Sequence, residues 1–328
     1  MKKFLVINTS YFGDVLLTDT LCQNIKLEYP DARVIFMVNK PFYEVAKYME
    51  GVDEVLCYEK AGTHKGIAGI FKFLNEHRES LKDSIDIAFV LYGNERGIVI
   101  AKALGVNTII SDNRGIFHYL FSTISVEKNH LGSVQQENAS LLTSLTKKDV
   151  VDLPIKYTPP LVAETYVQKL LSQLGIKLED ELVGLCTTSK KLEKDMPVST
   201  AVQVIADLNK AGKKVVYLGA GSRAAEYVTE LHAHGCKSFI DLTDKTSIAQ
   251  LAAVIQKCTA VISVDTGTLH LTCALGVPLV ALFYINDRKH LEKWAPAKYY
   301  PHVLLTGNIV AGDILNSLQT LLVSEGTL

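Results

Sequence analysis

The sequence lacks a long apolar run. No hydrophobic stretch in its 328 residues approaches the ~20 residues that a helix needs to span a bilayer. The start of the chain resembles a signal peptide for a few residues, but Asn8, Thr9, Ser10 and Asp14 end the apolar run too early. We therefore expect a cytoplasmic protein without a transmembrane segment.

Paired cysteines are also missing. The six cysteines include no CxxC pair, and most stand inside apolar runs, where a reduced cysteine behaves as a small hydrophobic side chain. They are Cys22, Cys57, Cys186, Cys236, Cys258 and Cys273. This pattern predicts neither disulfides nor a metal site, as is usual in a reducing compartment.

The sequence has no excess of either charge. It contains 34 Lys and Arg against 35 Asp and Glu, and neither half of the chain is basic, so nucleic acid is not an expected partner. Because 48% of the residues are hydrophobic, the chain can bury a large core, and its length suits two domains of ordinary size.

Short apolar runs alternate with amphipathic stretches along the chain. The expected strands cover residues 4–7, 34–38, 55–58, 85–91, 108–110, 182–186, 214–218, 238–240, 260–264 and 278–283. Helical patterns such as residues 15–28, 66–81 and 95–104 separate them. Alternation of this kind predicts an α/β fold with parallel sheets.

The segment 151–160, with its three prolines, separates two such series. We therefore expect two Rossmann-like domains, residues 1–157 and 158–328, which face a central cleft because open α/β sheets bind ligands at the carboxyl ends of their strands. The last helical pattern, residues 311–323, fits against either domain.

The first candidate for chemistry is Asp14, which follows Gly13 just after the first expected strand. A carboxylate at the carboxyl end of a strand is well placed to serve as a general base. The alternative is that Asp14 only caps the helix that follows, since aspartate is favoured at helix N-termini.

Two further segments are candidates for holding phosphate. Asp265, Thr266, Gly267 and His270 follow an apolar strand and open a helix, whose free amides attract anions. Residues 187–197 also follow a strand and offer hydroxyl and ammonium groups. The alternatives are a plain strand–loop–helix junction with a core histidine and a solvated charged loop.

A competing signal lies in residues 219–224, which fit the GxGxxA pattern of dinucleotide-binding folds. Asp241 follows Gly221 at the spacing that this pattern requires. The pattern normally occurs on the first strand of its domain, whereas here a strand and a helix precede it. A nicotinamide or flavin oxidoreductase would also leave Asp14 and the segment from Asp265 to His270 unexplained.

Taken together, these segments resemble the lipopolysaccharide heptosyltransferases of glycosyltransferase family nine. The most specific part is residues 263–278, which read SVDTGTLHLTCALGVP. Residues 4–18, with Gly13-Asp14, are similar to the start of that family, and Thr187-Thr188 followed by Lys194 is similar to its phosphate loop. The resemblance covers nearly the whole chain in order.

The resemblance implies a GT-B fold and an inverting, metal-independent transfer of a heptose from ADP-heptose to the lipid A-linked inner core of lipopolysaccharide, without a cofactor. It makes Asp14 the catalytic base and Lys194 the residue that stabilises the departing diphosphate. The implied donor-binding residues are Thr187, Thr188, Glu226, Asp265, Thr266, Gly267 and His270. No Asp-x-Asp pair of the metal-binding glycosyltransferase kind is present.

The sequence departs from the family at two places near the donor. The loop between Thr188 and Lys194 is two residues longer than usual, and residues 284–287 read YIND where the family has a Gly-x-Thr-Asp-Pro-like turn. Another nucleotide sugar therefore stays open as the donor, as does a GT-B epimerase that acts on a UDP-sugar and needs no acceptor, or a non-catalytic nucleotide-binding module.

A lipid-linked acceptor also implies reversible contact with the inner face of the bacterial inner membrane. The segment 60–82 is the first candidate surface, because Lys65, Lys72 and Arg78 accompany apolar residues that fit one helix face. Those apolar residues are Ile67, Ile70, Phe71, Phe73 and Leu74. Residues 114–121 are a second candidate. The alternative is that both are ordinary helices with their apolar faces in the core.

Overall fold

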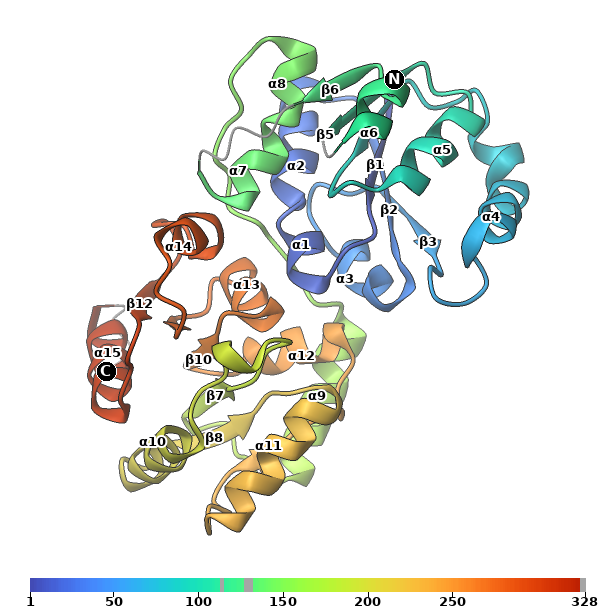
Figure 1. Ribbon diagram of the computed structural model, residues 1–328. Coiled ribbons are helices and arrows are strands. Elements are labelled where there is room, and N and C mark those ends of the chain that lie inside the picture. The colour runs from blue at the N-terminus through green and yellow to red at the C-terminus, as the bar shows by residue number, and fades with distance from the viewer. Residues whose placement is uncertain (113–114, 127–131, 325–328) are drawn as a thin grey trace. The chain divides into compact units, whose positions relative to one another are not determined.

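The computed structural model describes residues 1–112, 115–126 and 132–324, and it divides the chain into two compact units, Met1–Lys156 and Tyr157–Leu328 (Figure 1). The division falls one residue before the predicted one. Each unit contains a six-stranded sheet. Neighbouring strands in both sheets are parallel, so the α/β prediction is confirmed.

The first unit begins with a buried strand and alternates strands with helices. Its strands are β1 (Lys3–Asn8), β2 (Arg33–Asn39), β3 (Glu54–Tyr58), β4 (Ile87–Val90), β5 (Thr108–Asp112) and β6 (Ile124–Val126). Its helices are α1 (Phe12–Leu16), α2 (Asp19–Glu28), the 3-10 turn η1 (Lys40–Phe42), α3 (Tyr43–Lys47), α4 (Gly66–Leu81), α5 (Glu95–Ala103), α6 (Ile116–Phe121), α7 (Val134–Ala139) and α8 (Leu141–Thr146).

The second unit repeats this alternation. Its strands are β7 (Leu182–Cys186), β8 (Lys214–Tyr217), β9 (Ile240–Asp241), β10 (Ala260–Val264), β11 (Leu279–Phe283) and β12 (His302–Thr306). Its helices are α9 (Leu161–Gln173), the 3-10 turn η2 (Leu192–Lys194), α10 (Val198–Lys210), α11 (Gly221–Ala233), α12 (Ile248–Ile255), α13 (Gly267–Ala274), α14 (Arg288–Trp294) and α15 (Ala311–Ser324).

Both sheets have the strand order of a Rossmann fold. The order is β3-β2-β1-β4-β5-β6 in the first unit and β12-β11-β10-β7-β8-β9 in the second. In such sheets the second and third strands add to one side of the first strand, and the later strands add to its other side. The connections from the two central strands therefore diverge, which leaves room for a ligand at the carboxyl ends of these strands. These switch points lie at the ends of β1 and β4 and at the ends of β7 and β10.

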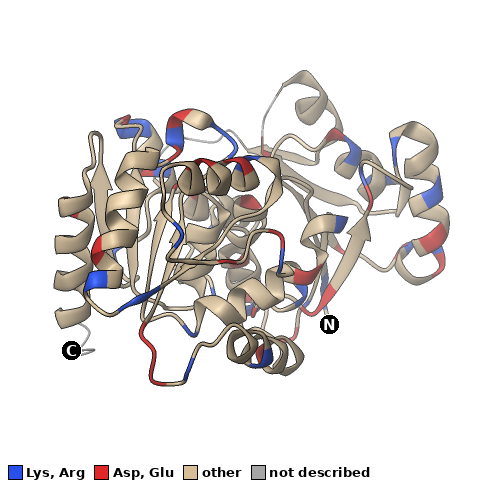
Figure 2. Ribbon diagram, turned by 90° about the horizontal axis from the view of Figure 1, so that it is seen from below, with Lys and Arg blue, Asp and Glu red and all other residues tan. Residues whose placement is uncertain are grey.

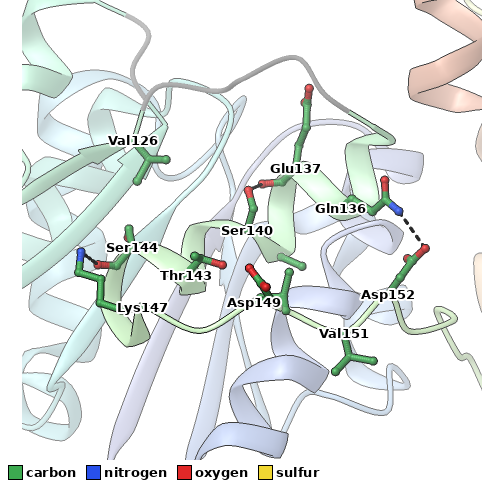
Figure 3. A pocket seen from close by; sticks show the side chains of 12 residues that line it. Val126, Gln136, Glu137, Ser140, Thr143, Ser144, Lys147, Asp149, Val151 and Asp152 are labelled. Carbon is green, nitrogen blue, oxygen red and sulfur yellow. Dashed lines mark hydrogen bonds between the residues drawn. The ribbon is translucent and has the colours of Figure 1, made fainter.

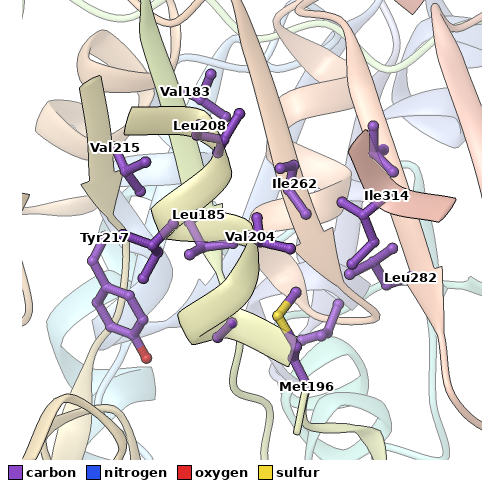
Figure 4. Packing of buried hydrophobic residues seen from close by; sticks show 14 of the residues in the cluster. Val183, Leu185, Met196, Val204, Leu208, Val215, Tyr217, Ile262, Leu282 and Ile314 are labelled. Carbon is purple, nitrogen blue, oxygen red and sulfur yellow. The ribbon is translucent and has the colours of Figure 1, made fainter. Parts of the chain in front are cut away.

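The last helix, α15, packs within the second unit. Ile314, Leu318 and Leu321 join a buried cluster with side chains from α10 and from the central strands. Figure 4 shows Ile314 beside Ile262 of β10 and Leu282 of β11, with Val204 of α10 nearby. The sequence had left the position of this helix open, because an apolar helix face does not by itself identify the sheet that it covers.

Two predicted elements differ from the structure near the ends of strands. The expected helix over residues 15–28 is two helices, because the Thr18 hydroxyl donates to the Asp14 carbonyl at 2.8 Å and accepts from the Asn8 amide at 2.9 Å. A hydroxyl that bonds to the backbone in this way competes with the helix ladder. The expected strand at 238–240 forms only at Ile240–Asp241.

The helix α4 has the predicted limits, Gly66–Leu81. It lies close to the loop that precedes it, and a Cβ atom at Gly69 would lie 2.1 Å from the His64 carbonyl carbon. Glycine is therefore needed at that contact. None of the helices in the described residues is both long and apolar enough to cross a membrane.

Charged residues of both signs are mixed along the chain (Figure 2), and most cysteines are buried, as expected for cysteines inside apolar runs. Figure 2 shows Lys and Arg interspersed with Asp and Glu along the chain. All six cysteines are free; five are buried, and Cys57 is partly buried.

Candidate functional site

The switch point of the second unit brings together residues that follow β7 and β10. These strands are neighbours in the sheet, so Thr187 and Thr188 at the end of β7 lie beside Asp265 and Thr266 at the end of β10. All four are polar, and the first three are buried. The Thr187 hydroxyl lies 2.9 Å from the Tyr217 hydroxyl, a partner on β8 that the sequence analysis did not identify.

Asp265 is the centre of the charged cluster at this point. Its Oδ2 atom accepts hydrogen bonds from Lys194 Nζ at 2.5 Å and from His290 Nε2 at 2.6 Å. Burial acts to raise the pKa of the Asp265 carboxyl, but the Lys194 ammonium, with His290 and His270, outweighs it and lowers the pKa below its usual value. Asp265 is therefore ionised at neutral pH.

His270 is the fourth residue of α13 and lies near this cluster. Its side chain is buried, and burial is the main cause that lowers its pKa to about 4, with the nearby Lys194 ammonium acting in the same direction against Asp265. The imidazole is therefore neutral at pH 7 and carries one N–H donor. Its ring lies 6.2 Å from that of Trp294, between centroids.

The N-terminus of α13 has no side-chain cap. Thr266 occupies the N-cap position with an extended backbone, and its side chain makes no capping hydrogen bond. The amides of the first turn, from Gly267 onward, therefore point out of the helix end without that partner. A helix N-terminus in this state, beside Lys194, is suited to an anion such as phosphate.

The loop that carries Lys194 is held by side chains that the sequence analysis did not single out. Asp195 accepts hydrogen bonds from the Ser189 amide at 2.7 Å and from Arg223 Nε at 2.8 Å. The Met196 amide donates to the Thr187 carbonyl at 2.9 Å, so the loop returns to the end of β7. These bonds place Lys194 at Asp265, whereas Lys190 and Lys191 are exposed.

Glu226 lies on α11 and does not join the charged cluster. Its side chain is 65% exposed and forms an ion pair with Arg223 at 3.8 Å. Of the predicted donor-binding residues in the second unit, the structure therefore gathers the rest around the ends of β7 and β10 and leaves Glu226 to the side. Among the described residues, no three His, Cys, Asp or Glu side chains are grouped as metal ligands would be.

Asp14 occupies the corresponding switch point of the first unit. It lies in the first turn of α1, directly after β1, and its Oδ2 accepts a hydrogen bond from the Tyr11 amide at 3.2 Å. The N-cap residue itself is Tyr11, so Asp14 contributes to the cap from inside the helix. This contact with the cap does not conflict with the predicted role of Asp14 as a general base.

A pocket of about 260 Å³ lies at the carboxyl edge of the same sheet. Thr9 and Ser10 follow β1, and the opposite wall follows β4. Its full lining is Thr9, Ser10, Lys60, Tyr92, Gly93, Asn94, Glu95 and Arg96. Two cationic side chains, Lys60 and Arg96, face one acidic residue there, so the pocket favours an anionic ligand.

The backbone of this pocket is strained at Tyr92. Its φ of 59° lies in the left-handed region, which bulky residues rarely adopt, and Gly93 follows with a φ of 62°. The Asp112 carboxylate accepts hydrogen bonds from both amides, at 3.0 Å and 3.1 Å, and holds this turn in place. Strain of this kind is commonly kept where a ligand binds.

A larger cavity, of about 800 Å³, lies beside α7 and α8 (Figure 3). Figure 3 shows Gln136 bonded to Asp152 and Lys147 bonded to the Ser144 carbonyl along its wall. None of the predicted site residues lines this cavity.

The predicted membrane residues Lys65, Lys72 and Arg78 are all exposed on or beside α4. The apolar residues predicted to share one face of this helix are only partly buried. Ile70 and Phe73 are buried in the cluster that covers the sheet, and Leu74, which packs against that cluster, is partly buried. The helix also packs on α5. In contrast, Ile67 and Phe71 are 75% and 63% exposed. On α6, Ile116, Tyr119 and Leu120 are exposed as well. Residue 114 lies outside the described residues.

Comparison with known proteins identifies the relatives of this chain. The model of glycosyltransferase family 9 (heptosyltransferase) matches residues 77–303. Lipopolysaccharide heptosyltransferase 3 of Escherichia coli K12 is 24% identical over 296 residues, which cover 87% of this chain and 83% of the relative.

Two solved structures share the fold over nearly the full length. The glycosyl transferase family 9 protein of Veillonella parvula superposes with a TM-score of 0.87 at 22% identity and covers 98% of each chain. The ADP-heptose lipopolysaccharide heptosyltransferase II of E. coli superposes with a TM-score of 0.81 at 19% identity over 99% of this chain and 100% of its own. The predicted GT-B fold is confirmed.

Proposed function

This chain belongs to glycosyltransferase family 9, the heptosyltransferase family, and from that premise we propose that it transfers a heptose from ADP-heptose to the lipid A-linked inner core of lipopolysaccharide or lipooligosaccharide. The observation that carries the proposal is the Lys194–Asp265 ion pair beside the uncapped N-terminus of α13. A cation and a helix N-terminus together supply what a departing diphosphate requires.

The donor binds at the switch point of the second unit. The amides of α13, the hydroxyls of Thr187 and Thr188 and the Lys194 ammonium hold the diphosphate. His270, neutral at pH 7, donates its N–H to a phosphate or ribose oxygen. Asp265 accepts a hydroxyl of the sugar. Glu226 is the residue proposed for the ribose, on the family resemblance alone.

The reaction is a single displacement with inversion. An acceptor hydroxyl oxygen attacks the anomeric carbon of the heptose, the bond from that carbon to the diphosphate oxygen breaks, and ADP leaves. Asp14 takes the proton of the hydroxyl as general base. Lys194 and the amides of α13 stabilise the negative charge that develops on the diphosphate, so we propose that neither a metal ion nor a cofactor takes part.

The acceptor binds in the first unit, in the pocket between the ends of β1 and β4. Lys60 and Arg96 suit an acidic group on the saccharide, and the hydroxyls of Thr9 and Ser10 suit its neutral oxygens. Asp14 follows Ser10 by four residues, at the end of the same strand. The attacking hydroxyl and its base are therefore supplied by one unit.

Because the acceptor is linked to a lipid, we propose that the protein works in the cytoplasm and contacts the inner face of the inner membrane reversibly. The exposed Lys65, Lys72 and Arg78 attract anionic lipid, each by about 1 kcal/mol near the surface. The exposed rings and branched side chains of Phe71 and Ile67 add apolar contact.

A donor screen tests this function against its alternatives. The turn from Tyr284 to Asp287 differs from the family pattern next to His290, so a different nucleotide sugar is the main competitor. The protein is incubated with ADP-heptose and with UDP-sugars, with and without acceptor. Consumption of ADP-heptose only when acceptor is present supports the proposal. Conversion of a UDP-sugar without acceptor indicates an epimerase, and binding without turnover indicates a nucleotide-binding module.

A further inference from the structure

The carboxylate of Asp265 is bonded twice through one oxygen. Oδ2 accepts from Lys194 of η2 at 2.5 Å and from His290 of α14 at 2.6 Å, and the three side chains are 8%, 17% and 20% exposed in the order Asp265, Lys194, His290. Within the described residues, Oδ1 of this carboxylate accepts no hydrogen bond. One oxygen therefore has two donors, and the other is left for a ligand.

His290 is fixed in place by its surroundings. Asp287 caps α14 and accepts hydrogen bonds from the amides of Lys289 and His290, at 3.4 Å and 3.2 Å. The imidazole also lies near the rings of Phe283 and Trp294, at centroid distances of 6.0 Å and 6.5 Å. Because an ionised carboxylate can only accept, the hydrogen between His290 and Asp265 is on Nε2.

Binding of the donor changes the hydrogen bonds of the Asp265 carboxylate, which Lys194 and His290 share. Lys194 must bond to the diphosphate, but in the structure its ammonium is bonded to Asp265. If an ionised carboxylate this deeply buried lost its only hydrogen-bond partner, the unpaired charge would cost free energy. A second donor on the same oxygen removes that cost, because Asp265 stays hydrogen-bonded after Lys194 has turned away.

We propose that His290 is a positioning residue for the donor: it holds the Asp265 carboxylate so that Lys194 is released to the diphosphate and Oδ1 accepts a hydroxyl of the donor sugar. This role rests on the proposed function, since it assumes that a nucleoside diphosphate binds beside α13. Its ligand is the diphosphate of the donor, reached through Lys194, and no bond is made or broken by His290 itself.

The test compares ADP with adenosine, which lacks the diphosphate. Affinities are measured by calorimetry for wild type, His290→Ala, His290→Gln and the control Lys289→Ala, whose side chain lies on the same helix and is exposed. His290→Ala should weaken ADP binding roughly tenfold, the change expected for one hydrogen bond to a charged group, while adenosine binding stays the same. Gln keeps an N–H donor, so His290→Gln should bind ADP nearly as wild type does, and Lys289→Ala should bind both ligands as wild type does.

Three results would overturn the proposal. They are an unchanged ADP affinity in His290→Ala, an equal loss for ADP and adenosine, and a His290→Gln variant that is as weak as His290→Ala. The first would mean that Lys194 needs no second partner on Asp265, the second that His290 only supports the fold, and the third that its hydrogen bond is not what matters. If the wild-type chain binds UDP and not ADP, the proposed donor is wrong, and the same ratios measured with UDP and uridine still decide the role of His290.

Discussion

The ion pair between Lys194 and Asp265 allows a prediction with a worked magnitude. Removing one member of a buried ion pair usually costs about 3–5 kcal/mol. In Lys194→Ala the His290 bond to the same oxygen remains, so we expect a smaller loss, about 2–3 kcal/mol in the free energy of unfolding at neutral pH. The control Lys191→Ala should change it by less than about 0.5 kcal/mol, because that side chain is 65% exposed and its pair with Glu193 spans 3.8 Å.

The same variant should show a pH dependence of known sign. In wild type the pKa of Asp265 is lowered on folding, so its contribution to stability is present at neutral pH and is lost as the pH falls through that lowered pKa. Lys194 is the main group that offsets the effect of burial on the pKa of Asp265. Without it, this pKa rises, and the ionised carboxylate becomes unfavourable at neutral pH. Protonation at lower pH relieves this cost, so the difference in unfolding free energy between wild type and variant should shrink as the pH falls from about 7.5 to about 4.5.

Urea unfolding at about pH 7.5 and about pH 4.5 measures both expectations. Turnover of the variant should also fall by ~10²–10³-fold, since Lys194 stabilises the charge that develops on the diphosphate. A loss of stability that is equal at the two pH values would refute the electrostatic explanation. Greater damage from Lys191→Ala than from Lys194→Ala would show that the wrong lysine has been placed at the diphosphate.

Four further predictions follow from the two units. Asp14→Asn should lower turnover by ~10²–10⁴-fold with little change in donor affinity, and a variant that keeps more than about a third of wild-type turnover would reduce Asp14 to a helix cap. Transferase activity should persist in EDTA, whereas complete loss of activity that a divalent ion restores would contradict the metal-free mechanism. Burial raises the pKa of Asp19 to about 6, although hydrogen bonds from the backbone and from Gln23 act to lower it, so ionisation of Asp19 destabilises the fold as the pH rises from about 4 to about 7.5. Over that range the free energy of unfolding of Asp19→Asn in urea, relative to wild type, should increase by about 2 kcal/mol. An unchanged difference would contradict the burial argument. Liposome co-sedimentation should require anionic lipid, weaken in high salt and drop in a Lys65/Lys72/Arg78→Glu triple variant, whereas equal binding to neutral vesicles would show that these residues do not capture the membrane.

Much of the fold was predictable because it depends on local patterns. The period of apolar residues placed α4 at Gly66–Leu81, and the short apolar runs placed the central strands of both sheets. The break between α1 and α2 was not predictable from that period, since it depends on the Thr18 hydroxyl bonding to the Asp14 carbonyl and the Asn8 side chain. The sequence left open whether the apolar residues of α4 face a membrane or the core, because the exposure of Ile67 and Phe71 and the burial of Ile70 and Phe73 depend on how the helix packs.

The candidate site was predictable where residues follow a strand end directly. Thr187, Thr188, Asp265 and Thr266 do so, and two adjacent parallel strands then bring them together. His290 was missed, because it reaches Asp265 from 25 positions along the chain through the turn after β11. Asp287, directly before a run of charged residues, was the available signal for the start of α14, but no local pattern gives the contact of the third residue of this helix, His290, with Asp265.

The identity of the product tests the central claim most directly. The purified protein is incubated with ADP-heptose and a lipid A-linked inner-core acceptor, and the product is examined by mass spectrometry and by NMR at the new glycosidic bond. We predict an acceptor heavier by one heptose residue, with the anomeric configuration inverted relative to the donor and one ADP released for each transfer. Retention of configuration, or transfer of a different sugar in preference to heptose, would contradict the proposed function.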